Sequence, residues 1–114
     1  PIGYRLKGSV MGFPAGPLTL VYVGDCASCS LRQFSPETLG TNASQTLFIF
    51  RMEPSEENWK RFSNYGRKHL DDNGNLGREL NAYFTPRIYR LSKDRSIVSL
   101  STERDLQKYE VVRK

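Results

Sequence analysis

The chain has 114 residues, of which 38% are hydrophobic, and carries a formal net charge of +5. This length predicts a single domain, residues 1–114, with one core, and no apolar run approaches the ~20 residues of a membrane span. The basic residues are scattered among acids such as Glu53, Glu56 and Glu57, so we expect a solvated basic surface and no nucleic-acid partner.

The first half of the chain predicts two buried strands separated by a helix. Residues 4–10 alternate weakly and predict an edge strand. The apolar run at residues 18–23 predicts the first buried strand. Residues 27–34 should form a helix that Pro36 ends. Residues 46–52 then predict the second buried strand.

A second helix should begin after Ser55. Its hydroxyl is a typical cap, and acidic residues follow in the first turn. Trp59 and Phe62 give this helix its apolar side. We place His69 on the surface at a helix end.

The second half of the chain should end with a hairpin and a helix. Residues 71–75 predict a turn and residues 76–83 a short helix. Residues 87–91 and 96–100 alternate like strands joined by a tight turn, and a last helix is expected over residues 101–109. Strands joined through a helix should be parallel, with a right-handed crossover, so we expect an α/β fold with a mixed sheet.

The two cysteines are the main chemical signal. Cys26 and Cys29 enclose two residues and follow directly after the first buried strand. Helix amides at this point would stabilise a thiolate at Cys26, and Cys29 would lie one turn later, close enough for a disulfide. Two inert buried cysteines are the alternative, but the spacing after a strand favours a redox pair.

A metal site is not expected. Two cysteines are too few for a four-cysteine zinc site, and His69 is the only histidine. A set of both cysteines, His69 and an acid has no ligand spacing to support it. We therefore predict no metal ion and no other cofactor.

Two segments, in this order, resemble the thioredoxin-like superfamily. They are residues 18–29 (LTLVYVGDCASC) and residues 72–98 (DNGNLGRELNAYFTPRIYRLSKDRSIV). The likeness extends from residue 18 to about residue 109 and is greatest to extracytoplasmic thiol–disulfide oxidoreductases and thiol-dependent antioxidant proteins. It implies a three-layer sandwich: a central mixed sheet with parallel strands, a C-terminal antiparallel hairpin, and helices on both faces.

The resemblance also implies roles for individual residues. Cys26 would be the nucleophile and Cys29 the resolving thiol. Thr85 and Pro86 match the family's threonine and cis-proline, and the Thr85 backbone would pair with an extended substrate strand. Arg87, beside them, would meet an acidic partner or offset a nearby negative charge.

The sequence departs from the family pattern in several places, among them Asp25, where many relatives have tryptophan, and the Ala-Ser pair between the cysteines. Leu20 stands where thioredoxins carry a buried acid, so we expect Asp25 or Glu79 to modulate the thiols instead. A carboxylate at Asp25 would raise the pKa of Cys26 by like-charge repulsion, or Asp25 would simply cap the helix. The region before residue 18 also lacks the Pro-x-x-x-Thr-x-x-Cys pattern of peroxidase relatives.

Three functions follow as hypotheses. The first is a thiol–disulfide oxidoreductase that exchanges disulfides with protein partners. The alternatives are a peroxiredoxin-like antioxidant protein and a non-catalytic binding module of the same fold. We expect a monomer. We favour an extracytoplasmic location, periplasmic or membrane-tethered with a leader removed, over a cytoplasmic one.

Overall fold

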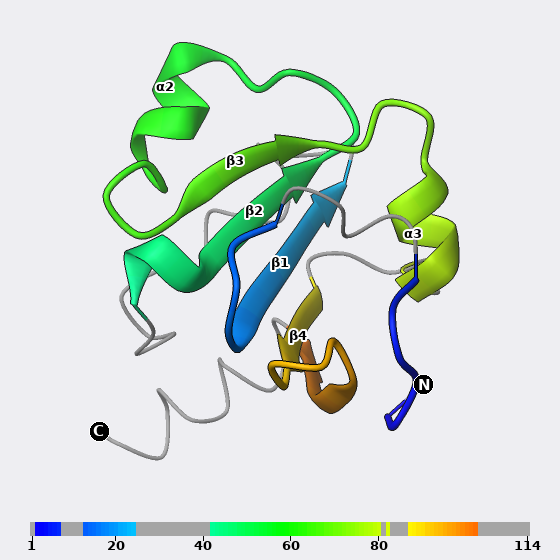
Figure 1. Cartoon of the computed structure of the whole chain (residues 1–114). Coiled ribbons are helices and arrows are strands. Elements are labelled where there is room, and N and C mark those ends of the chain that lie inside the picture. The colour runs from blue at the N-terminus through cyan, green and yellow to red at the C-terminus, as the bar shows by residue number, and fades with distance from the viewer. Residues whose placement is uncertain (1, 8–12, 25–41, 81, 83–86, 103–114) are drawn as a thin grey trace, which may run out of the picture.

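A five-stranded mixed sheet organises the part of the chain that the structure describes. The computed structural model describes residues 2–7, 13–24, 42–80, 82 and 87–102. The strands, in chain order, are β1 (Leu18–Gly24), β2 (Thr46–Phe50), β3 (Arg67–Leu70), β4 (Arg87–Leu91) and β5 (Ile97–Thr102). Their order across the sheet is β3-β2-β1-β4-β5 (Figure 1).

The strand directions confirm the expected mixed sheet. β1, β2 and β3 are parallel neighbours, whereas β4 runs antiparallel to both β1 and β5. The carboxyl ends of β1, β2 and β3 therefore lie along one edge of the sheet (Figure 1). The turn between β4 and β5 lies at the opposite edge, beside the start of β1, where Leu18 pairs with Leu91.

Helices cover both faces of this sheet, as expected for a three-layer α/β sandwich. α2 (Glu56–Lys60) is capped by Ser55, whose hydroxyl accepts a hydrogen bond from the Asn58 amide at 3.2 Å. α3 (Asn75–Leu80) packs on the other face, and a 3-10 turn, η3 (Ala43–Gln45), precedes β2. None of the described helices is long and apolar enough to cross a membrane.

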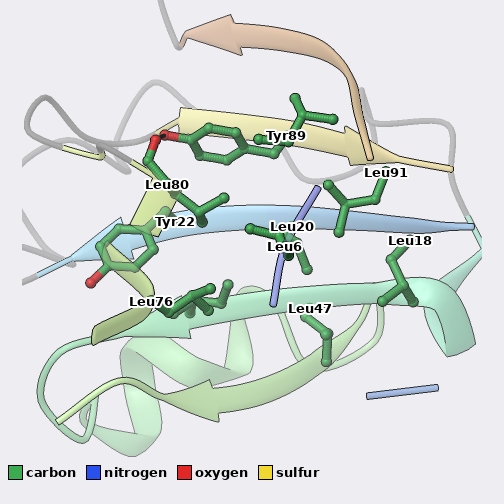
Figure 2. Packing of buried hydrophobic residues seen from close by; sticks show 11 residues of the cluster. Leu6, Leu18, Leu20, Tyr22, Leu47, Leu76, Leu80, Tyr89 and Leu91 are labelled. Atoms are coloured by element: carbon green, nitrogen blue, oxygen red, sulfur yellow. Dashed lines mark hydrogen bonds between the residues drawn. The ribbon is translucent and has the colours of Figure 1, made fainter. Parts of the chain in front are cut away.

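The core has two halves because successive side chains of a strand point to opposite faces. The half under α3 consists of Leu6, Leu18, Leu20, Tyr22, Leu47, Ile49, Leu76, Leu80, Tyr89, Leu91 and Ile97 (Figure 2). The half under α2 consists of Val21, Val23, Phe48, Phe50, Phe62 and Ile88, with Trp59 packed against it. Both faces of β1 are buried, which explains why its sequence is continuously apolar rather than alternating.

β3 corrects one prediction. α2 ends at Lys60, and residues 67–70 form a parallel edge strand beside β2 rather than a helix end. His69 therefore lies on a strand, half-buried, with its ring 5.0 Å from that of Phe13. Most side chains of this strand are exposed, so the sequence lacks the apolar pattern that predicts strands.

The ends of other predicted elements also change. In the described residues the expected strand at 4–10 is only a single bridge between Arg5 and Ser96. The strand at 46–52 stops at Phe50, and residues 101 and 102 extend β5 instead of starting a helix. The predicted helix at 27–34 and the rest of the last helix lie outside the described residues.

One buried carboxylate holds α3 on the sheet. Asp71, at 5% exposure, accepts hydrogen bonds from the Tyr22 hydroxyl at 2.6 Å and from the amides of Leu76 at 3.0 Å and Gly77 at 2.8 Å. A Cβ on Gly77 would come within 2.5 Å of the Tyr22 hydroxyl oxygen. Glycine at this position therefore allows the tyrosine to reach the carboxylate.

These hydrogen bonds decide the charge state of Asp71. Burial alone would raise the pKa of this carboxyl, but the bonds from Tyr22, Leu76 and Gly77 and the nearby His69 outweigh it, so the pKa lies below its usual value. A carboxylate with a lowered pKa stabilises the fold at pH values above its pKa in the unfolded state. This stabilisation is lost as the pH falls through the pKa of the folded state.

Gly66 should be intolerant of any side chain. A Cβ there would lie 2.7 Å from both the Phe48 ring and the Thr46 carbonyl oxygen. We expect Gly66→Ala to lower the free energy of unfolding by about 2 kcal/mol through overpacking. Urea denaturation measures this. Asn64→Ala, at an exposed position in the same turn, is the control and should change little; an equal loss in both variants would contradict the steric explanation.

Asp71→Asn should destabilise the protein in a pH-dependent way. At pH 7 we expect a loss of about 2 kcal/mol, because an amide cannot replace a carboxylate that accepts three hydrogen bonds. The difference from wild type should shrink as the pH falls through the folded-state pKa of Asp71. Denaturation over a pH series tests this, with the exposed neighbour variant Asp72→Asn as control. A loss that is constant down to strongly acidic pH would contradict it.

Candidate functional site

The carboxyl end of β1 leads directly into the cysteine motif. β1 ends at Gly24, whose φ of 80° is in the region that favours glycine. The Gly24 carbonyl accepts a hydrogen bond from the Arg51 amide at 3.2 Å, which fixes this end against the end of β2. Asp25, Cys26 and Cys29 lie outside the described residues, so their roles stay predictions. Chain connectivity alone keeps the Cα of Cys26 within about 7.6 Å of that of Gly24.

The second sequence segment returns to the same edge of the sheet. β4 begins at Arg87, which pairs with Tyr22 of β1 in antiparallel register. Thr85 and Pro86 lie outside the described residues, but Pro86 is bonded directly to Arg87. Tyr22 precedes Cys26 by four residues, and Arg87 directly follows Pro86. These two residues, far apart in the sequence, are therefore neighbours across a strand pair.

Arg87 itself is half-buried on the sheet face under α3. Its guanidinium lies beside Tyr89, whose hydroxyl donates to the Leu80 carbonyl at 3.1 Å. Burial raises the pKa of Tyr89, although the hydrogen bond from Arg87 and its positive charge oppose this. The described contacts of Arg87 thus include a core tyrosine, and its contact with a partner stays a prediction.

Glu79 is engaged by the N-terminal segment. Its carboxylate accepts hydrogen bonds from the Tyr4 hydroxyl at 3.0 Å and from the Lys7 amide at 2.8 Å. The bond to Glu79 raises the pKa of Tyr4, with help from burial and from the negative charge. Glu79 therefore has a structural role, because it holds residues 4–7 against α3. Its influence on the thiols stays a prediction.

The sequence pattern predicts only a turn at Asp71 and does not mark it as a functional residue. Among the described residues Asp71 is the one buried acidic side chain. The position of Asp71, just before a turn and an apolar helix, is the one sequence feature that indicates this role. Acidic side chains near the start of a helix often accept hydrogen bonds from its first amides.

His69 lies close to Asp71 and shares an open hollow of ≈ 190 Å³ with it. Burial lowers the pKa of His69, although the charge of Asp71 opposes this. The imidazole is therefore mostly neutral near neutral pH. In the described part of the chain, no group of three or more His, Cys, Asp or Glu side chains could hold a metal ion.

Comparison with solved structures gives clear fold neighbours. The thioredoxin domain of a thiol-disulfide oxidoreductase from Bacteroides vulgatus matches with a TM-score of 0.54 and 15% identity, over 89% of this chain and 80% of that one. A thiol:disulfide interchange protein from a Bacteroides species matches with a TM-score of 0.56 and 15% identity, over 87% and 74%. A thioredoxin-like protein in its oxidized form matches with a TM-score of 0.58 and 11% identity, over 95% and 83%.

Neither the protein-family models nor the curated proteins gave a match to this sequence. Another structural neighbour, from Bacteroides fragilis, is a conserved protein of unknown function, and a shared fold does not by itself fix an activity. The likeness does identify the architecture, because the neighbours cover most of this chain. The chain has the fold of the thioredoxin-like superfamily.

Proposed function

We propose that this protein is a thiol–disulfide oxidoreductase that exchanges disulfides with protein partners through Cys26 and Cys29. The pairing of Tyr22 with Arg87 carries this proposal. It brings the strand that leads into the cysteines beside the strand that follows Thr85 and Pro86. The structural neighbours that are thiol-disulfide oxidoreductases support the same chemistry at the level of fold.

In the proposed reaction, the Cys26 thiolate attacks one sulfur of a partner disulfide. A mixed disulfide forms, the partner's S–S bond breaks, and one partner sulfur leaves as a thiolate. Cys29, as thiolate, then attacks the Cys26 sulfur and releases the second partner thiolate. The partner has gained two electrons and the protein holds a Cys26–Cys29 disulfide. In the reverse direction the same steps oxidise a partner dithiol.

The other site residues bind the partner or modulate the thiols. In our proposal the backbone of Thr85, held by Pro86, pairs with an extended segment of the partner, and Arg87 lies beside that segment. A negative charge at Asp25 opposes thiolate formation at Cys26. Glu79, on α3, adds a second negative charge. We further propose that the chain acts as a monomeric domain, residues 1–114, outside the cytoplasm, where disulfides persist.

Single cysteine variants test the proposal. Cys26→Ser should abolish reduction of an insulin or peptide disulfide. Cys29→Ser should instead accumulate a mixed disulfide with the partner, because the resolving thiol is missing. Mass spectrometry of the trapped complex and a turbidity assay measure the two outcomes, with Ser28→Ala as the control that keeps both thiols.

The same variants separate the alternatives. A peroxidase would consume peroxide without a disulfide substrate, through a sulfenic acid at Cys26. A binding module of this fold would show neither exchange nor peroxide turnover while remaining folded. Either result would contradict the proposed exchange activity.

A further inference from the structure

Two arginine side chains converge on one glycine. The guanidinium carbon and Nη2 of Arg51 lie 3.1 Å from the point that a Cβ on Gly74 would occupy, and Nη1 of Arg78 lies 3.3 Å from it. Gly74 has a φ of 74°, in the loop that joins β3 to α3. Both arginines are exposed, so their charges face solvent at a single point of the surface, which we call the arginine pair.

No carboxylate of the described residues forms an ion pair with Arg51 or Arg78. Within the described residues the one ion pair joins Lys68 to Glu53. Arg78 is oriented by uncharged acceptors, because its Nη2 donates to the Asn73 carbonyl at 3.1 Å and also to the Asn75 side chain. Two like charges held this close repel each other, and a shared oxyanion relieves the repulsion through charge-assisted hydrogen bonds.

The acids near Gly74 do not take this place. Asp71 is buried, and its oxygens already accept bonds from a hydroxyl and two amides. Asp72 is exposed, yet it forms no ion pair within 4 Å among the described residues. The described acids therefore leave the arginine pair open to a carboxylate supplied by another molecule.

The arginine pair lies at the cysteine edge of the sheet. The Arg51 amide binds the Gly24 carbonyl, and Cys26 follows Gly24 by two residues. The loop that carries Gly74 runs from the end of β3 to α3 along this edge (Figure 1). The Arg51 backbone is hydrogen-bonded to the residue two positions before Cys26, and an extended peptide advances ~3.3 Å per residue, so the arginine pair would be met by an acidic residue a few positions from a partner's reacting cysteine.

We propose that Arg51 and Arg78 select partners that carry acidic residues a few positions from the reacting cysteine. This inference rests on the proposed exchange activity and names its substrate class. Guanidinium groups suit this role because they bind carboxylates bidentately. The arginine pair would add selection by side-chain charge, which pairing with the Thr85 backbone does not supply.

Peptide disulfides of matched length test the selection. Three peptides would place two Glu, two Gln or two Lys residues three positions from the cysteine. At low salt we expect kcat/KM for the Glu peptide to exceed that for the Gln peptide about fivefold, and the Lys peptide to be slowest. Added NaCl should reduce the differences, because charges on a surface are screened.

Variants locate the effect. In the double variant Arg51→Gln and Arg78→Gln, the ratio of kcat/KM for the Glu peptide to kcat/KM for the Gln peptide should fall to about one. Lys93→Gln, in the exposed turn at the opposite edge, removes the same charge and should leave the ratio unchanged. A ratio near one in the wild type, or one that survives in the double variant, would overturn the proposal. Oxidised glutathione is a further substrate to compare. If the two arginines raise kcat/KM for it as much as for the Glu peptide, the proposal would be overturned in favour of a small carboxylate substrate.

A binding experiment separates this inference from the exchange chemistry. The Glu peptide with serine in place of cysteine cannot react, but it should shift the Nε–Hε NMR signals of Arg51 and Arg78. The Gln peptide should not. Shifts without any exchange activity would contradict the proposed function and not the arginine pair, whereas exchange activity without shifts would contradict the arginine pair alone.

Discussion

The hydrogen bonds of the Asp71 carboxylate are the constraint on which the described structure depends most. They join a side chain of β1, the end of β3 and the first turn of α3 in a place that is almost closed to water. α3 is only six residues long, too short to be stable alone. Its position, and with it the course of the chain toward β4, comes from this carboxylate and from the apolar contacts of Leu76 and Leu80 with the sheet.

The central position of β1 in the sheet fixes the point from which the cysteine segment departs. β1 is hydrogen-bonded on one side to parallel β2 and on the other to antiparallel β4. The hydroxyl of Tyr22, on β1, donates a hydrogen bond to Asp71, and the carbonyl of Gly24, the last residue of β1, accepts one from the Arg51 amide. A strand held on both edges and both faces ends at a fixed point. In the proposed function, the geometry of the thiols starts from that fixed point.

Much of the fold could be predicted from the sequence because its central strands are unambiguous. The structure confirms several features that local patterns predict: the strands at residues 18–23 and 87–91, the Ser55 cap and the hairpin turn. β3 could not be predicted, since its exposed polar residues become a strand only by pairing with β2. The cysteine motif was visible from spacing, whereas the roles of Asp71 and Arg51 depend on contacts between distant segments, which no local pattern records.

The contact between Gly77 and Tyr22 has a consequence for how this sequence can diverge. Any side chain at position 77 would meet the Tyr22 ring, whose Cζ lies 2.9 Å from the point where a Cβ would stand. A larger residue at 77 therefore requires a smaller one at 22, and a smaller one leaves the Asp71 carboxylate without its hydroxyl donor. The three positions are therefore coupled, because a change at 77 or at 22 alters the hydrogen bonds that the Asp71 carboxylate accepts.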